Sequence, residues 1–302
     1  MKIGFALPVS GSWATPENIR HCAARAEALG YHELWTFQRL LSAVDDSWGE
    51  VYRSVVDPLV TLGYVAALTR RIRLGAAVVN MPFVTPVLLA KQAATVDVLS
   101  NGRLDLGVGL GWSDEEYTAS GASKKNQGRR AEEFIAALRT LWTEQNVAHD
   151  GEFYRIPAAK AAPKPVQPGG PPILLGGTAP GALQRAGRLA DGWVSSSRAD
   201  LSRIDESIDI VKAAAAEAGR DPAALRFVCR GVVRVREQSK DRAPLMGTLK
   251  EIQGDLDALA GTGLTEVFLD LNFDPEVGSP DADPAASLER AETVLTALAP
   301  TR

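Results

Sequence analysis

The hydrophobic and polar positions of the chain follow a pattern that repeats from end to end. A short apolar run is followed by a longer stretch with apolar residues every three or four positions. Eight apolar runs have the length of strands, at residues 2–8, 33–37, 72–79, 103–109, 172–177, 192–196, 226–235 and 266–271. Continuous rather than alternating apolar character is typical of parallel strands that are covered on both faces. The pattern therefore predicts eight strand–helix units.

Proline marks the predicted helix starts. A residue with a side-chain oxygen precedes proline at Thr15-Pro16, Asp57-Pro58, Thr85-Pro86, Asp221-Pro222 and Asp283-Pro284. Such an oxygen accepts a hydrogen bond from a free helix N–H, and proline suits the first turn because its missing N–H would have no partner there. At a further helix start, Ser113 and Glu116 have the spacing of a capping box.

Eight strand–helix units in 302 residues predict a (β/α)8 TIM barrel that forms a single domain over residues 1–302. A doubly wound open sheet is the alternative. The run "RLDLGVGLGW" (103–112) does not fit a dinucleotide-binding turn, because it follows the fourth strand and spaces its glycines as Gly-x-Gly-x-Gly. In a barrel, Gly107, Gly109 and Gly111 lie at the C-terminal mouth, where active sites form and where glycine lets the backbone approach a flat ligand.

Composition argues against several classes of protein. A net charge of −4 argues against a general binder of nucleic acid or membrane surfaces, and no apolar run is long enough to span a membrane. The first residues lack the long apolar core of a signal peptide, so we expect a cytoplasmic protein. Cys22 and Cys229 are expected to be reduced and buried. His21, His32 and His149 lack the spacing of metal ligands, so we expect no metal site.

Several segments directly after the predicted strands could bind a ligand. "GGTAP" (176–180) joins two glycines to a helix start whose free N–H groups suit a phosphate, although a plain tight turn explains it equally well. "SKKNQGRR" (123–130) is either a solvated basic face or an anchor for an anionic cofactor. Seven aromatic residues on these loops could wall an apolar pocket: Trp13, Phe37, Trp48, Tyr52, Phe83, Trp112 and Tyr117.

Acids and bases are few at the predicted mouth. No histidine follows a strand, and we interpret Asp114, Glu115 and Glu116 first as charges that complement a helix dipole. A hydrolase triad or a metal centre therefore has little support. A bound cofactor that carries the difficult chemistry fits this set of residues, because the protein then supplies only binding and orientation.

Five segments resemble the luciferase-like monooxygenase superfamily, and within it the oxidoreductases that use the deazaflavin coenzyme F420. They are "LGAAVVN" (74–80), "PVLLAKQAATVDVLSNGRLDLGVGLGWSDEEY" (86–117), "GRRAEEFIAALRTLW" (128–142), "PKPVQPGGPPILLGG" (163–177) and "AGRLADGW" (186–193). The resemblance covers about residues 1–200 well and the last third more loosely. It implies a (β/α)8 barrel, an insertion around 143–172 against the mouth, and a flavin or deazaflavin lying there.

The resemblance also implies which residues contact the ring of that cofactor. A non-prolyl cis peptide is implied at Ala77-Val78, where it would bulge against the centre of the tricyclic ring. Gly109, Leu110 and Gly111 would line the ring or its ribityl chain.

For the phosphate, the resemblance implies backbone N–H groups of Gly176, Gly177 and Thr178. Arg129 matches a position that contacts phosphate in some relatives.

The sequence departs from the family pattern at two candidate catalytic positions. Where relatives commonly have an acidic residue followed by histidine after the second strand, this chain has Gln38 and Arg39. Gln38 could hydrogen-bond the ring or the substrate, and Arg39 could hold an anion. Trp112 stands where relatives that oxidise sugar phosphates have a glutamate, which favours a less polar substrate.

The resemblance implies an oxidoreductase that transfers a hydride between C5 of coenzyme F420 and a small, rather apolar organic substrate. One alternative is an FMN-dependent two-component monooxygenase supplied by a separate reductase. Another is a barrel that binds a flavin or deazaflavin without turnover. Relatives imply a homodimer, and we expect a small-molecule substrate rather than a nucleic acid or a membrane as the binding partner.

Overall fold

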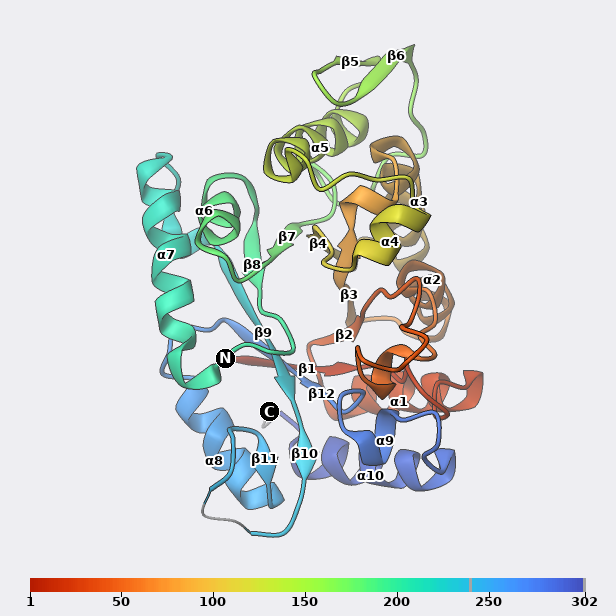
Figure 1. The fold of residues 1–302 in the computed structure, drawn as a ribbon, viewed down its shortest axis with the longest axis vertical. Coiled ribbons are helices and arrows are strands. Elements are labelled where there is room, and N and C mark those ends of the chain that lie inside the picture. The colour runs from red at the N-terminus through yellow and green to blue at the C-terminus, as the bar shows by residue number, and fades with distance from the viewer. Residues whose placement is uncertain (239–240, 301–302) are drawn as a thin grey trace.

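The structure is a computed structural model that describes residues 1–238 and 241–300, and it forms a closed barrel of eight parallel strands (Figure 1). In order around the barrel the strands are β1 (Lys2–Ala6), β12 (Glu266–Asp270), β9 (Arg226–Val232), β8 (Gly192–Val194), β7 (Ile173–Gly176), β4 (Leu104–Gly109), β3 (Arg73–Asn80) and β2 (Glu33–Thr36). Strand β1 pairs with both β12 and β2, which closes the ring and excludes the open sheet. All eight predicted strands are present.

In the described part of the chain, ten α-helices lie outside the barrel or at its mouth (Figure 1). They are α1 (Pro16–Leu29), α2 (Pro58–Leu68), α3 (Pro86–Ser100), α4 (Asp114–Ala119), α5 (Gln127–Thr143), α6 (Pro180–Leu189), α7 (Ile204–Glu217), α8 (Leu249–Leu259), α9 (Pro275–Gly278) and α10 (Pro284–Ala297). The single turns of 3-10 helix are η1 (Glu50–Tyr52), η2 (Met81–Phe83), η3 (Leu201–Arg203) and η4 (Pro222–Ala224).

The predicted caps are confirmed. Thr15, Asp57, Thr85 and Asp283 each accept a backbone N–H bond at the start of an α-helix, and Asp221 does so at η4. These bonds satisfy N–H groups that would otherwise have no partner in the first helical turn.

The barrel interior is plugged by apolar side chains below the mouth. They are Ala6, Trp35, Ala77, Leu174, Val194, Val228 and Phe268, with Val78 packed against them. The rings of Trp35 and Phe268 stack with centroids 4.9 Å apart. The interior is thus a packed core, and any ligand has to bind above it, at the carboxyl ends of the strands.

Two small sheets lie outside the barrel. Strands β5 (Val147–Asp150) and β6 (Arg155–Ala159) form an antiparallel hairpin within the predicted insertion, and Figure 1 places it on the outer side of α5. The Glu133 carboxylate of α5 accepts the N–H groups of Phe153 and Tyr154 in the hairpin turn. Strands β10 (Arg234–Val235) and β11 (Met246–Gly247) pair beyond the end of β9.

The cysteine prediction is confirmed: Cys22 and Cys229 are free and buried. Burial raises the pKa of both thiols to about 12, so they remain protonated and unreactive at neutral pH. Among the helices of the described residues, none combines the length and apolar character needed to cross a bilayer.

Candidate functional site

A cavity of about 740 Å³ opens at the carboxyl ends of the barrel strands, above the apolar plug. Ten of the eleven predicted site residues line it: Gln38, Ala77, Val78, Gly109, Leu110, Gly111, Trp112, Gly176, Gly177 and Thr178. The volume is in the range of ordinary small-molecule and cofactor sites. The structure therefore brings together residues that lie far apart in the sequence, although their roles stay predictions.

The side chain of Val78 forms the floor of the cavity between two strand ends. The Ala77–Val78 peptide bond is cis, as the resemblance implied. A Cβ atom built at Gly109 would lie 2.5 Å from Cγ2 of Val78, and one at Gly176 would lie 2.9 Å from Cγ1. These two glycines are therefore required for packing against Val78. Their interpretation as bare backbone against a ligand is incomplete, since a protein side chain fills the space beside them.

A site suited to an anion lies at the start of α6. Among the α-helices of the described chain that begin with proline, α1, α2, α3, α9 and α10 are capped by a Thr or Asp side chain, whereas α6 follows Ala179 and has no side-chain cap. In its first turn Ala182 and Leu183 donate to the Ala179 carbonyl, whereas no described residue accepts the N–H groups of Gly177, Thr178 and Gly181. These groups are left for a ligand where the helix dipole favours negative charge. Gly177 has φ +144, and Nε1 of Trp193 holds its carbonyl at 2.9 Å.

The opposite side of the cavity is held by a buried ion pair. Nη1 of Arg39 donates to Glu116 at 3.0 Å, and the two side chains are 5% and 0% exposed. Glu116 also accepts the backbone N–H groups of Leu40 (2.7 Å) and Leu41 (3.2 Å). The prediction of a capping box at Ser113 is half right, because Ser113 accepts the Glu116 N–H while the Glu116 carboxylate turns away to the β2 loop. Glu116 lies in the first turn of α4, where its charge was predicted to complement the helix dipole, but its carboxylate is fully buried against Arg39.

Aromatic rings surround the Arg39 guanidinium. Its central carbon lies 4.5 Å from the ring centroid of Trp112, 4.7 Å from that of Tyr52 and 5.6 Å from that of Trp48. Burial lowers the pKa of Arg39, and the Glu116 carboxylate opposes that effect. Trp112 lines the cavity and is itself 46% exposed. Of the seven predicted mouth aromatics, Trp13 is fully buried and belongs to the core.

Gln38 lies in the cavity wall with a defined orientation. Its Oε1 accepts the backbone N–H of Asn80 at 2.8 Å, which leaves the two hydrogens on Nε2 free to point toward a ligand. The geometry fits the predicted hydrogen-bonding role of Gln38.

Arg129 differs from the other predicted residues because it does not line the cavity. It is on the outer surface of α5, forms an ion pair with Glu152 and stacks on the ring of Phe153. Its contact with phosphate stays a prediction. The insertion at 143–172 likewise packs on α5 and contributes no residue to the cavity lining.

Arg230 is a cavity residue that the sequence analysis missed. It lies in β9, is 8% exposed, and its Nε is 3.0 Å from Oδ2 of Asp270. In the register of β9 and β12, Arg230 is opposite Phe268 and two residues beyond the plug residue Val228. An arginine inside the apolar run "RFVCRGV" was the available signal, because a charged side chain in a buried strand requires a partner.

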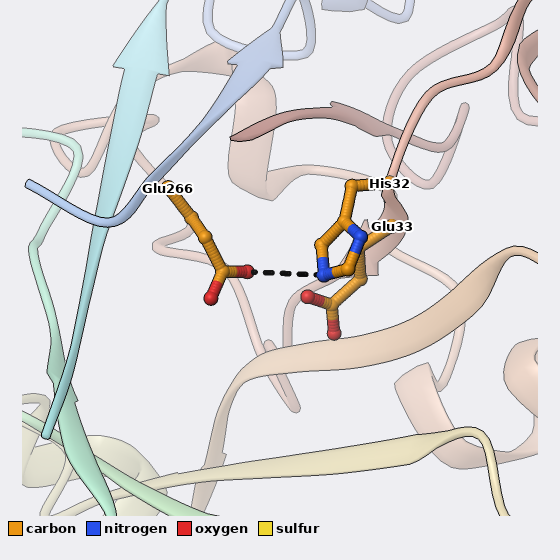
Figure 2. A group of neighbouring side chains, drawn as sticks. All are labelled: His32, Glu33 and Glu266. Carbon is orange, nitrogen blue, oxygen red and sulfur yellow. Dashed lines mark ion pairs between the residues drawn. The ribbon is translucent and has the colours of Figure 1, made fainter. Parts of the chain in front are cut away.

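A second polar cluster lies at the opposite, N-terminal end of the barrel, where Figure 2 shows His32 facing Glu266 with Glu33 beside them. Their ligand atoms lie within 4.8 Å of one another, the spacing of a metal site. However, the Arg226 guanidinium binds both oxygens of Glu266 (2.7 and 2.8 Å) and also contacts Glu33 and Asp105. A fixed positive charge already occupies the centre, so the cluster is an ion network of the barrel base.

Burial and the charges of this base network shift the pKa values of Glu33 and Asp105 in opposite directions. Two guanidiniums, Arg73 and Arg226, face the carboxyl groups of Glu33, Asp105 and Glu266. Burial, together with the Asp105 carboxylate, raises the pKa of Glu33 well above its usual value. Burial opposes ionisation of Asp105 as well, but the two arginines hold its pKa below the usual value.

Comparison with known proteins gives the same assignment along most of the chain. A model of the luciferase-like monooxygenase family matches residues 1–263. An uncharacterised protein of Mycobacterium tuberculosis is 38% identical over 170 residues, which are 56% of this chain and 60% of that protein.

Two further relatives use different cofactors. The FMNH2-dependent dimethylsulfone monooxygenase of Pseudomonas putida is 31% identical over 208 residues, 68% of this chain and 56% of that protein. The F420-dependent glucose-6-phosphate dehydrogenase of Amycolatopsis mediterranei is 31% identical over 201 residues, 65% of this chain and 58% of that protein. These matches span only 56–60% of the length of the three relatives.

The fold as a whole is shared with a solved structure. A monooxygenase of Streptomyces bottropensis has a TM-score of 0.79 and 24% identity, over 99% of this chain and 98% of that chain. The closed barrel, the cavity above its plug and the family match together establish that the chain belongs to the luciferase-like monooxygenase family.

Proposed function

We propose that the protein is an oxidoreductase that binds coenzyme F420 in the mouth cavity and transfers a hydride between it and a small organic substrate. The observation that carries the proposal is the convergence of ten predicted residues on one cavity with an uncapped helix start at its edge. The donor set fits the cofactor, because free backbone N–H groups favour a phosphate and the apolar floor at Val78 favours a flat ring.

The chain's own residues bind and orient in this proposal. Gly177 and Thr178 hold the phosphate at the start of α6, and Val78 supports the ring from below. When bound, the deazaflavin supplies a hydride acceptor and donor at ring carbon C5. Gln38 directs an N–H group into the cavity, and Trp112 covers the opening, which limits the access of water. Holding two reactants at contact distance accounts for much of the rate enhancement of such a transfer.

A flavin mononucleotide monooxygenase is the second candidate. The Pseudomonas putida relative, which is FMNH2-dependent, favours it at the same level of identity as the F420-dependent relative. That enzyme would require reduced flavin from a separate reductase. A barrel that binds the cofactor without turnover is the third candidate.

Titration with each cofactor tests the proposal. The chain has six tryptophans, and Trp112 and Trp193 line the cavity, so binding of either cofactor should quench tryptophan fluorescence. We expect F420 to bind more tightly than FMN, and the reduced form to be consumed by an electrophile from a broad panel. Tighter binding of FMN with oxygen-dependent turnover would support the monooxygenase. Binding without any turnover would support the third candidate, and binding of neither cofactor would refute the proposal.

We also propose a homodimer, which the family resemblance implies. Six apolar side chains on the packed helices α2 and α3 are exposed: Val60, Tyr64, Val87, Leu88, Val98 and Leu99. An apolar face of this kind favours association with another surface. Light scattering after size-exclusion chromatography should give twice the mass of one chain for the wild-type protein. The Leu88→Asp variant should have the mass of one chain. A monomeric wild-type protein would contradict the dimer.

A further inference from the structure

The cavity has a charged region that the function proposed above does not use. Two nearly buried guanidiniums, those of Arg39 and Arg230, face its aromatic end. Both carry hydrogens that no described residue accepts. Nε of Arg39 is buried without a hydrogen-bond partner, and neither Nη atom of Arg230 donates to a described residue. Nε of Arg230 lies 3.0 Å from Oδ2 of Asp270, but the two atoms lack hydrogen-bond geometry.

The two guanidiniums belong to one pocket because they share an aromatic wall. Arg39 lies 4.7 Å from the Tyr52 ring, and Arg230 lies 4.9 Å from Phe37 and 5.2 Å from Phe273. The three rings are in mutual contact, with centroids 5.4 Å apart for Phe37–Phe273, 5.9 Å for Tyr52–Phe273 and 6.4 Å for Phe37–Tyr52. A ligand on this wall therefore meets apolar surface with a guanidinium at either side.

The ion pairs leave the Arg198 cation beside these guanidiniums, while Asp200, which also lines the cavity without an ion pair in the described part of the chain, balances it over the cavity as a whole. Glu116 balances Arg39 and Asp270 balances Arg230, whereas Arg198 lines the cavity without an ion pair to any residue in the described part of the chain. Arg198 is also close enough to add to the effect of burial in lowering the pKa of Arg39. An anion that enters beside Arg39 and Arg230 would satisfy the unused N–H groups.

We propose that the aromatic end of the cavity is a substrate pocket for an organic acid, whose carboxylate is bound by Arg39 and Arg230 while its apolar body packs on Phe37, Tyr52 and Phe273. The proposal rests on the proposed function and names its substrate class. A carboxylate is planar and matches the fork of donors that a guanidinium presents. The expectation of a rather apolar substrate then holds for the body of the molecule and not for its end group.

Matched acid and amide pairs test this without any substitution. The probes are benzoate and benzamide, cinnamate and cinnamamide, and hexanoate and hexanamide, measured by calorimetry with and without bound cofactor. We expect at least one acid to bind about tenfold more tightly than its amide, equivalent to about 1.4 kcal/mol. If no acid binds more tightly than its amide, including the case in which neither binds, the proposal is overturned.

Variants identify the groups responsible. Arg230→Gln and Arg39→Gln should reduce the affinity for the acid to that for the amide and leave the amide unchanged. Arg155→Gln, which removes a positive charge from the exposed β5–β6 hairpin, should alter neither. If Arg230→Gln does not fold because Asp270 loses its partner, Arg39→Lys tests whether the forked donors of the guanidinium are needed. Lysine keeps the positive charge but lacks the fork, so this variant should still bind the acid more weakly.

The cofactor titration separates the two proposals. The same variants should bind F420 or FMN as the wild-type protein does. If the variants lose affinity for the cofactor and keep their affinity for the acid, the guanidiniums belong to the cofactor site and the substrate proposal is wrong. Tighter binding of phenyl phosphate than of benzoate would also overturn it, in favour of a phosphate ester. Wild-type protein that binds acids but neither cofactor would refute the proposed function while supporting the acid pocket.

Discussion

The buried Arg39–Glu116 pair should stabilise the whole cavity wall. The Glu116 carboxylate is fully buried and accepts three hydrogen bonds, one from Arg39 and two from the backbone at Leu40 and Leu41. Removing one partner of a buried pair costs about 3–5 kcal/mol, because the other charge is left uncompensated. Glu116→Gln keeps one acceptor oxygen, so we expect a loss of about 2–4 kcal/mol in the free energy of unfolding.

A double-mutant cycle isolates the pair. Arg39→Gln and Glu116→Gln each remove the same interaction, so the double variant should lose little more than the worse single variant. The expected coupling is about 2 kcal/mol, within the usual range for residues in contact. Denaturant unfolding supplies the free energies, provided that the slope with denaturant concentration is unchanged among the variants.

The exposed pair of Asp150 and Arg155 serves as the control. Its side chains are 78% and 81% exposed, and the cycle of Asp150→Asn and Arg155→Gln should give well under 1 kcal/mol of coupling. A coupling at Arg39–Glu116 no larger than that of this control would refute the reasoning that burial makes the pair a structural anchor of the mouth.

Three further predictions concern the cofactor site, the wall and the barrel base. Gly177→Ala places a Cβ at a residue with φ +144 and 2.6 Å from Cβ of Ala182, so the cofactor should bind about tenfold more weakly. Gly181→Ala is the control, because its added Cβ meets nothing within 4 Å and the cofactor should bind normally in the same titration. Equal cofactor affinities of the two variants would contradict a phosphate site at Gly177. Gln38→Leu removes the N–H group that Gln38 directs into the cavity and leaves the Asn80 N–H without its acceptor. Single-turnover hydride transfer should therefore slow about tenfold with an unchanged cofactor Kd, and an unchanged rate would remove Gln38 from the mechanism. The raised pKa of Glu33 means that the folded protein holds this proton more tightly than the unfolded chain, so its contribution to stability is complete below pH 4.5 and is lost as the pH rises through the folded pKa. Between pH 5 and pH 8 the free energy of unfolding of the Glu33→Gln variant should therefore fall by at least about 1 kcal/mol less than that of the wild-type protein. If the two free energies depend on pH in the same way, the pKa of Glu33 is not raised in the fold.

Periodicity and capping were sufficient to predict the barrel. Continuous apolar runs marked every barrel strand, and Thr15, Asp57 and Thr85 marked helix starts by chemistry that acts within one turn. Such signals are local, so they can be read from a single sequence.

The contacts inside the cavity could not be predicted in the same way. The partners Arg39 and Glu116 are 77 positions apart, and Arg230 and Asp270 are 40 apart, so neither pairing leaves a local pattern. Gly109 was recognised as a close-approach position, but the group approaching it is the side chain of Val78, which depends on the register of β3 against β4. Local pattern thus located the mouth, while tertiary packing determined which charges meet there.

A crystal structure with bound cofactor tests the central claim most directly. We predict that the tricyclic ring packs on the Ala77–Val78 floor and that its phosphate accepts hydrogen bonds from the N–H groups of Gly177 and Thr178. Density for the cofactor elsewhere on the protein, or a mouth cavity that stays free of it at saturating concentration, would contradict the account.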